Sequence, residues 1–337
     1  MSGLPTVDAP CALCGSERAE AVWTTTDRAF AIPGLYTVAR CCDCGFLYER
    51  PRVRSEHLAA CYPDNYPRHQ EPSPRVPFKG PPTRVRAVRW ALASGLGYAD
   101  LRDDEVGLLT RLWARTLLPR LRWSCPPRVG DGRYLDVGCG SGAWLGLARA
   151  LGWRVAGIEV NEAAAQKARG FTDELHVGDV LDAPFATACF DVVTAFHVLE
   201  HVVDPVAVAR RMLDWLAPGG LLIIEVPNAG GLGAALFGRA WAGLELPRHL
   251  SHFTPHTLER TVRKAGGRVV WCWHQAKPRY YLWSLSNLLR DRGSETLATL
   301  TEWRPAYGVL KLVLELTLPL VRWAGRGEVI RIGAVRD

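Results

Sequence analysis

Short apolar runs alternate with stretches of helical periodicity through the second half of the chain. Each run is brief and β-prone, as buried strands are, and the stretches between the runs place apolar residues three and four positions apart, which is typical of helices. The predicted strands cover 133–137, 153–160, 175–180, 190–195, 221–226, 267–274 and 329–335. This alternation of strand and helix predicts an α/β fold with a doubly wound sheet.

The stretch 133–144 organises this pattern. It predicts a buried strand, a turn containing Gly138, Gly140 and Gly142, and the start of a helix. Glycine lets a ligand approach the backbone closely, so this layout is typical of a nucleotide site. Asp136 at the end of the strand would repel a pyrophosphate but attract a cation. S-adenosylmethionine (SAM) has no phosphate and carries an ammonium and a sulfonium, so we expect SAM here.

Two more acidic residues end the next two predicted strands. Glu159 lies about 20 positions beyond the glycine turn, where a carboxylate can accept both hydroxyls of a ribose. Asp179 ends the third strand. Each could be a helix cap or a surface charge, but three carboxylates after three successive strands are not expected by coincidence.

The spacing G-x-G-x-G with an acidic residue two positions before it resembles the first motif of class I SAM-dependent methyltransferases. The resemblance continues motif by motif over 133–228 and, with a weaker match beyond, covers roughly the last 60% of the chain. It implies a Rossmann-like sheet of seven strands with the last strand antiparallel. It also implies that Asp179 receives the adenine amino group, that Val180 belongs to the cofactor site, and that His197 lies near the sulfonium.

Two pairs of cysteines near the N-terminus are spaced as metal ligands. Cys11 and Cys14, and Cys41 and Cys44, form C-x-x-C turns that are each followed by glycine. Two such turns facing each other across a hairpin supply four thiolates for tetrahedral Zn²⁺, with no open position for water. The other six cysteines are scattered, which indicates a reducing compartment rather than a disulfide set. With this zinc ribbon the chain resembles ribbon-bearing class I methyltransferases, whose core is close to the ubiquinone-pathway O-methyltransferases.

The pattern divides the chain into a ribbon, a linking region and a methyltransferase domain. The predicted boundaries are 1–50 for the zinc ribbon, 51–130 for the connector and helical segment, and 131–337 for the methyltransferase domain. Within the linking region we expect a Pro-rich connector over 51–80 and helices over 82–96 and 104–122. Within the methyltransferase domain we expect a glycine-rich lid at 230–255 and an insertion at 277–327.

Methyl transfer from a sulfonium mainly needs an aligned acceptor and the exclusion of water, and a base helps where the acceptor is a hydroxyl or a carbon acid. The candidate bases are His197 and His201 after the fourth strand, and His249 and His252 in the run RHLSHFTP, which also resembles the family. The run HVLEH matches the H-x-x-E-H pattern of inverted zinc proteases, but that pattern needs a long helix and here follows a strand. Ubiquinone-pathway enzymes carry a divalent-ion cluster ending in Glu-His here. His197 stands where that cluster has its first Glu, which argues against a metal.

The insertion contains a nearly apolar stretch at 305–324. A membrane-spanning helix is disfavoured, because Lys311 and Glu315 lie near its centre, where a charge costs about 2.5–3.5 kcal/mol, and Pro319 interrupts it. We expect a helix that seals the substrate pocket. Peripheral contact with a membrane surface is the alternative.

The chain carries a net charge of +7, and the segment 75–128 holds 11 basic and 4 acidic residues. A basic segment and a zinc ribbon could grip RNA, but FHVLEH follows the fourth strand in place of the Asn/Asp-Pro-Pro-Tyr motif that holds a flipped base. A SAM-binding scaffold without activity is disfavoured because all three cofactor carboxylates are present.

We expect an enzyme that methylates a hydroxyl oxygen of a small-molecule acceptor. We expect it to be cytoplasmic, since no apolar leader is visible. C-methylation of an activated carbon in a sugar or polyketide-like acceptor is the alternative.

Overall fold

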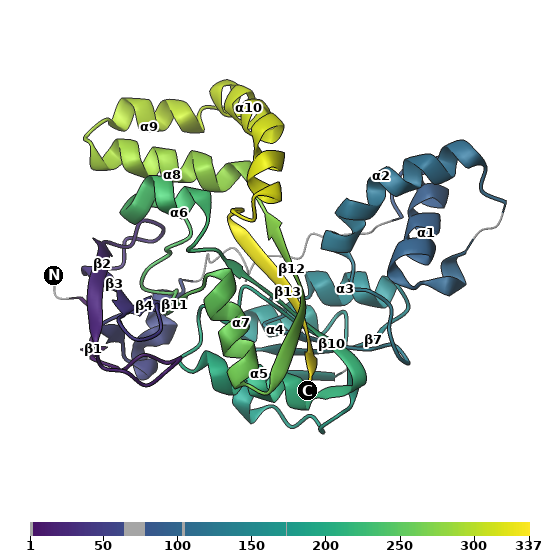
Figure 1. The fold of residues 1–337 in the computed structure, drawn as a ribbon, viewed down its shortest axis with the longest axis horizontal. Helices are drawn as coiled ribbons and strands as arrows, with labels where there is room; N and C mark the ends of the chain where they lie inside the picture. The colour runs from purple at the N-terminus through teal and green to yellow at the C-terminus, as the bar shows by residue number, and fades with distance from the viewer. Residues whose placement is uncertain (1–2, 64–77, 103–104, 173) are drawn as a thin grey trace.

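The centre of the molecule is a seven-stranded sheet (Figure 1). The computed structural model describes residues 3–63, 78–102, 105–172 and 174–337, so part of the predicted Pro-rich connector, 64–77, lies outside the described residues. The strand order is β12-β13-β10-β9-β6-β7-β8. The strands are β6 (Arg133–Val137), β7 (Arg154–Glu159), β8 (Glu174–Val177), β9 (Phe190–Phe196), β10 (Leu216–Pro227), β12 (Gly267–Gln275) and β13 (Val329–Arg336).

The direction of the strands agrees with the predicted fold. β13 is antiparallel to both of its neighbours, β10 and β12, and β6 to β10 pair in parallel. The predicted Rossmann-like sheet with an antiparallel last strand is therefore confirmed. Because the carboxyl ends of β6, β7, β8, β9 and β10 meet at one edge of the sheet, the loops that follow them can share a site.

Helices cover both faces of the sheet, because successive side chains of a strand point to opposite sides. Leu135 faces a core shared with α5 and α7, whereas its neighbour Tyr134 faces a core shared with α1, α2 and α3. The helices of the core and of the linking region are α1 (Pro82–Leu96), α2 (Leu108–Ser124), α3 (Ala143–Ala150), α4 (Glu162–Ala168), α5 (Pro205–Asp214), α6 (Leu232–Phe237) and α7 (Pro255–Lys264). The predicted helices at 82–96 and 104–122 are α1 and α2, the second of which begins four residues later than expected.

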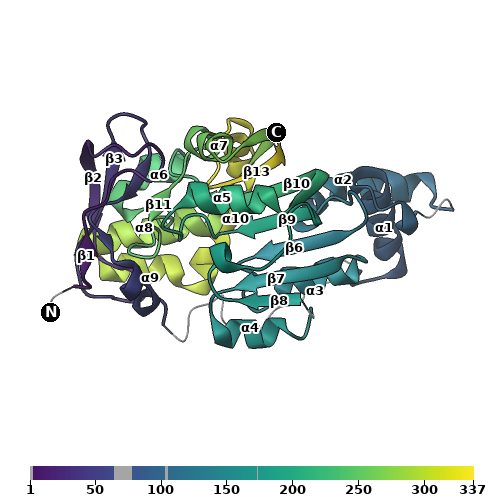
Figure 2. The same cartoon turned by 90° about the horizontal axis from the view of Figure 1, so that it is seen from below.

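Residues 6–53 form what we call the N-terminal module. Its four-stranded sheet includes one strand from the methyltransferase domain (Figure 2). The strand order is β11-β4-β3-β2, and β11 pairs with β4 in antiparallel fashion. β1 pairs separately with β5. The elements are β1 (Thr6–Val7), β2 (Ala19–Thr25), β3 (Tyr36–Cys41), β4 (Leu47–Glu49), β5 (Arg52–Val53) and β11 (Ser251–His252). The segment predicted as a lid is thus fixed to this module.

Three helices occupy the insertion between β12 and β13. They are α8 (Pro278–Asp291), α9 (Glu295–Glu302) and α10 (Arg304–Trp323), which form a layer at the upper left of Figure 1. In the described ranges, no helix combines the length and the apolar character needed to cross a membrane.

Candidate active site

The glycine turn between β6 and α3 is closely packed. Gly138, Gly140 and Gly142 all have positive φ angles, which glycine adopts without strain. At Gly138 a Cβ atom would lie 2.5 Å from Cγ2 of Val198, so a larger residue would push the turn against the loop after β9. Asp136 is buried beside this turn and accepts a hydrogen bond of 2.7 Å from the Thr194 hydroxyl.

The three predicted cofactor carboxylates lie along one edge, at the ends of the adjacent strands β6, β7 and β8. The Glu159 carboxylate accepts the N–H of Gly140 at 2.7 Å and that of Asn161 at 2.9 Å, so it joins the glycine turn to the loop after β7. Asp179 is exposed and accepts the N–H of Leu181 at 2.8 Å, while Val180 beside it is buried. The order of the strands therefore brings these predicted residues together.

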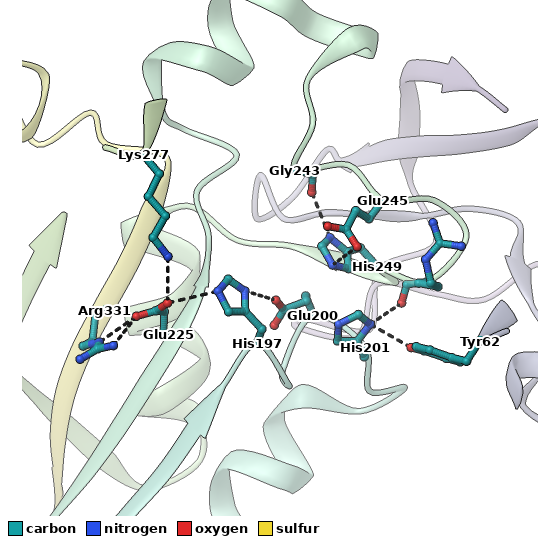
Figure 3. A network of polar contacts seen from close by, with 11 residues as sticks. Tyr62, His197, Glu200, His201, Glu225, Gly243, Glu245, His249, Lys277 and Arg331 are labelled. Atoms are coloured by element: carbon teal, nitrogen blue, oxygen red, sulfur yellow. Dashed lines mark hydrogen bonds and ion pairs between the residues drawn. The ribbon is translucent and has the colours of Figure 1, made fainter. Parts of the chain in front are cut away.

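His197 lies between two buried carboxylates (Figure 3). Its Nδ1 is 3.0 Å from Glu200 and its Nε2 is 3.1 Å from Glu225. A neutral imidazole has one N–H, so only the imidazolium form can donate to both carboxylates. The backbone of His197 is left-handed, with φ of 57°, and its N–H donates to the carbonyl of Glu225. The residue is therefore fixed in place by its side chain and its backbone.

Two positively charged side chains, those of Arg331 and Lys277, contact Glu225. Arg331 donates to it from Nε at 2.9 Å, and Nζ of Lys277 lies 3.5 Å away. Burial acts to raise the pKa of Glu225, but the charges of Arg331 and Lys277 hold this pKa well below the usual value. Glu225 and Arg331 were not among the predicted site residues. A single charged residue in each of the apolar strands LLIIEV and VIRIGAV was the signal that could have found them.

A second histidine group lies beyond Glu200. Nδ1 of His201 is 3.0 Å from the carbonyl of Arg248 and 2.9 Å from the hydroxyl of Tyr62. Because a carbonyl only accepts, the tautomer that satisfies Arg248 carries its proton on Nδ1. Nδ1 of His249 likewise lies 3.0 Å from the carbonyl of Gly243. The His201 and His249 rings are 4.7 Å apart.

Burial keeps His249 and His252 neutral. Desolvation and the neighbouring His201 hold the pKa of His249 well below 6.5, and desolvation lowers the pKa of His252 to about 4. Nε2 of His252 and Oε2 of Glu200 have no hydrogen-bond partner in the described part of the chain. Donor atoms of Glu200, His201 and His249 lie within 4.8 Å of one another, so these three residues could hold a divalent cation.

A buried ion pair joins this group to the N-terminal module. The Arg248 guanidinium donates to both oxygens of Asp27, at 2.9 and 2.8 Å, and both side chains are fully buried. Burial opposes the ionisation of Asp27, but Arg248 holds its pKa below the usual value. The same arginine supplies the carbonyl that orients His201. Sequence reasoning missed this pair because its members are more than 200 residues apart.

A cavity of about 390 Å³ opens between the module and the insertion. Its wall comes from residues 25–30, from the loop after β9, from the loop containing His249, and from α8. His197, His201 and His249 line the cavity, and His252 is not among the lining residues. The expectation that 305–324 seals the substrate pocket is not met at this cavity, because α8 supplies part of its wall and no described residue of α10 lines it.

The four predicted zinc ligands also converge. The Sγ atoms of Cys11 and Cys44 are 3.5 Å apart, as are those of Cys14 and Cys41, and all four lie within 4.8 Å of one another. The two C-x-x-C turns precede β2 and β4, so the β2–β3–β4 sheet brings them face to face. Four thiolates in one cluster are a donor set that suits Zn²⁺.

Comparisons with known proteins show what the chain is similar to. Residues 108–270 match a family model described as a methyltransferase domain. A ubiquinone biosynthesis O-methyltransferase of Thiobacillus denitrificans is 32% identical over 167 residues, which are 44% of this chain and 69% of that protein. The 27-O-demethylrifamycin SV methyltransferase of Amycolatopsis mediterranei is 34% identical over 145 residues, which are 39% of this chain and 53% of that protein. A SAM-dependent methyltransferase structure from Mesorhizobium loti is 18% identical with a TM-score of 0.43, and it covers 65% of this chain and 97% of that one.

The chain therefore belongs to the class I SAM-dependent methyltransferases. The match spans only about half of the rifamycin relative, and the family model begins at residue 108, so it leaves the four-cysteine module uncovered.

Proposed function

We propose that the protein transfers the methyl group of SAM to a hydroxyl oxygen of a small-molecule acceptor bound between the N-terminal module and α8. One observation carries this proposal: the cavity is lined by His197 and His201, which follow β9, and β9 is the neighbour of β6, the strand that carries Asp136. Its volume of about 390 Å³ lies in the range of small-molecule sites. The two relatives named above are O-methyltransferases by name or by substrate, which supports oxygen as the acceptor atom.

Asp136 and Glu159 would bind the donor. The buried Asp136 carboxylate suits the ammonium of SAM, and Glu159 suits the ribose hydroxyls. Asp179 and Val180 would flank the adenine. Gly138, Gly140 and Gly142 keep side chains out of the space that the donor needs.

We assign the base to His201. The carbonyl of Arg248 accepts the Nδ1 proton of His201, so in this tautomer the basic lone pair of the ring is on Nε2, and His201 lines the cavity. As the acceptor oxygen bonds to the methyl carbon, the carbon–sulfur bond breaks, the hydroxyl proton passes to Nε2 of His201, and S-adenosylhomocysteine is formed. His249 is less suited, because its low pKa weakens it as a proton acceptor. His197 is engaged by two carboxylates and would position Glu200, and His252 lies outside the cavity wall.

We also propose that Cys11, Cys14, Cys41 and Cys44 bind a structural Zn²⁺. The closed set of four sulfurs leaves no position for a reacting water. The metal would fix the two turns that support the module's sheet.

Calorimetry with SAM tests the donor site. Asp136→Asn and Glu159→Gln should each bind SAM roughly tenfold or more weakly, because each loses a charge-assisted contact. Asp131→Asn is the control, since Asp131 is exposed at the other end of β6. If either variant binds as the wild type does, that residue has no role in donor binding.

Methyl transfer to a panel of hydroxylated acceptors tests the base. His201→Gln should lower turnover by about 10²–10⁴-fold with SAM affinity unchanged, and His249→Gln should lower it less. Mass and NMR analysis of the product separates O- from C-methylation. A product methylated on carbon would show that the enzyme is a C-methyltransferase. Full turnover by His201→Gln would show that His201 is not the base.

A further inference from the structure

Exposed apolar side chains are concentrated in the insertion. Among the described residues, 20 large apolar side chains are exposed, and 10 of them lie in the 41 residues from 283 to 323. They are Trp283, Leu297, Leu300, Trp303, Val309, Leu312, Val313, Leu316, Leu320 and Trp323. A soluble monomer rarely leaves such a group in contact with water, so a partner is expected to cover it.

α10 has two apolar sides. Leu318 is 4% exposed and faces the rest of the protein. Val309, Leu312, Val313, Leu316 and Leu320 recur at helical spacing on the other side, with 54–75% of each exposed, and Trp323 at the end of the helix is 90% exposed. These six residues form what we call the outer face of α10. Since α8 and not α10 lines the cavity, packing inside the molecule does not account for this face.

The helix α2 carries a second group of exposed apolar side chains. α2 exposes Leu108, Leu109, Leu112 and Trp113, and in Figure 1 both α2 and α10 rise on the upper side of the sheet. Both regions are basic. Residues 75–128 hold 11 basic and 4 acidic residues, and residues 278–327 hold 7 basic and 4 acidic residues. Exposed apolar side chains on segments with a surplus of Arg and Lys match an anionic surface with an apolar interior.

We propose that the outer face of α10, with the exposed residues of α2, docks the enzyme on an anionic membrane surface. Charge decides between a membrane and a second copy: a symmetric dimer through this side would bring two basic regions together, whereas anionic lipid headgroups attract them. Tryptophans at 303 and 323 stand at the two ends of α10, where indoles prefer the membrane interface. Because no described helix can span a bilayer, α10 lies on the surface. This inference does not depend on the proposed methyl transfer.

Cosedimentation with vesicles tests the proposal. The full chain should pellet with phosphatidylcholine vesicles that contain about one-third phosphatidylglycerol, and it should pellet less with phosphatidylcholine alone or at high salt. Leu316→Glu combined with Leu320→Glu should weaken the partitioning by about tenfold or more. Leu35→Glu is the matched control, because Leu35 in the N-terminal module is also 75% exposed, and this variant should bind as the wild type does.

Light scattering on the same proteins distinguishes a membrane from a second copy of the chain as the partner of the outer face of α10. A wild-type chain that stays in the supernatant with both kinds of vesicle overturns the proposal. So does a Leu316→Glu, Leu320→Glu variant that pellets like the wild type. A wild-type dimer that the double substitution converts to monomer, without any vesicle binding, assigns the outer face of α10 to self-association instead. Circular dichroism confirms that each variant is folded, which is expected because both leucines are exposed.

Discussion

Two regions outside the core sheet attach to it in opposite ways. The N-terminal module is joined by buried polar contacts: the Asp27–Arg248 pair is fully buried, and β4 shares a sheet with β11. The helical insertion packs against α6 through α8 and against β12 through α10, and it leaves the outer face of α10 in solvent. Both regions line the same cavity, so attachment to the site alone does not explain the difference.

The difference indicates separate roles. The charges of Asp27 and Arg248 are buried at the module junction as a pair, and a buried pair of this kind favours one geometry. The junction therefore sets the positions of His201 and His249. The insertion presents apolar groups that nothing in the described chain covers, which suits a surface that meets an external partner. If this is so, substitutions in the module junction should destabilise the protein strongly, whereas substitutions on the outer face of α10 should leave its stability nearly unchanged.

Removal of the metal should have the largest effect. The wild type should hold about one zinc per chain, and Cys14→Ser should lose it, because a closed four-thiolate site depends on every ligand. Unfolding free energy should then fall by roughly 5 kcal/mol or more, since structural zinc contributes directly to folding. Cys42→Ser is the control, because this adjacent thiol is exposed and outside the cluster. Metal analysis and thermal unfolding give the answer, and full zinc content in Cys14→Ser would disprove the ligand set.

Breaking the buried ion pair should come next. Asp27→Ala leaves the Arg248 guanidinium buried without its carboxylate, which should cost about 3–5 kcal/mol in urea unfolding. Glu259→Ala removes an exposed i,i+4 pair with Arg263 and should cost about 0.5 kcal/mol or less. A loss below 1 kcal/mol in Asp27→Ala would mean that the module is only loosely attached and would remove the contrast with the insertion.

Much of the core could be predicted from the sequence because its signals are local. The short apolar strands, the glycine turn, Asp136 and the two C-x-x-C pairs are each visible within a few residues. The structure brings these residues together as the order of strands requires.

The junction could not be predicted, because its contacts join distant segments. Nothing near Asp27 or Arg248 in the sequence points to the other. β11 is only two residues long and takes its register from β4, so no strand pattern announces it. The apolar periodicity of α10 predicted a helix correctly, but periodicity does not say whether an apolar side faces a pocket or solvent.

The pH dependence of stability should depend on two buried groups with opposite effects, Glu49 on β4 and His252 on the adjacent strand β11. Burial raises the pKa of Glu49 to about 8, so its contribution to stability is full below pH 4.5 and is lost as pH rises through 8. Burial lowers the pKa of His252 to about 4, so the unfolded chain takes up a proton below pH 6.5 that the folded chain refuses, and stability falls as pH falls toward 4.

Urea unfolding of single variants separates these two groups. Between pH 6.5 and 5 the His252 contribution amounts to about 2 kcal/mol. His252→Asn should therefore lose less stability than the wild type over this range. Glu49→Gln should lose less stability than the wild type between pH 6 and 8. If the plots of unfolding free energy against pH run parallel for all three proteins, neither Glu49 nor His252 has a pKa that folding shifts.

The smallest effect is expected on the outer face of α10. Leu316→Ala removes a side chain that is 75% exposed and should change unfolding free energy by no more than about 0.5 kcal/mol. Leu318→Ala is the matched comparison two residues away on the buried side, and it should cost about 2–5 kcal/mol because it leaves a cavity. If Leu316→Ala costs as much as Leu318→Ala in urea unfolding, the outer face of α10 is covered within the protein itself. It would then be unavailable to a membrane, and the contrast between the module and the insertion would disappear.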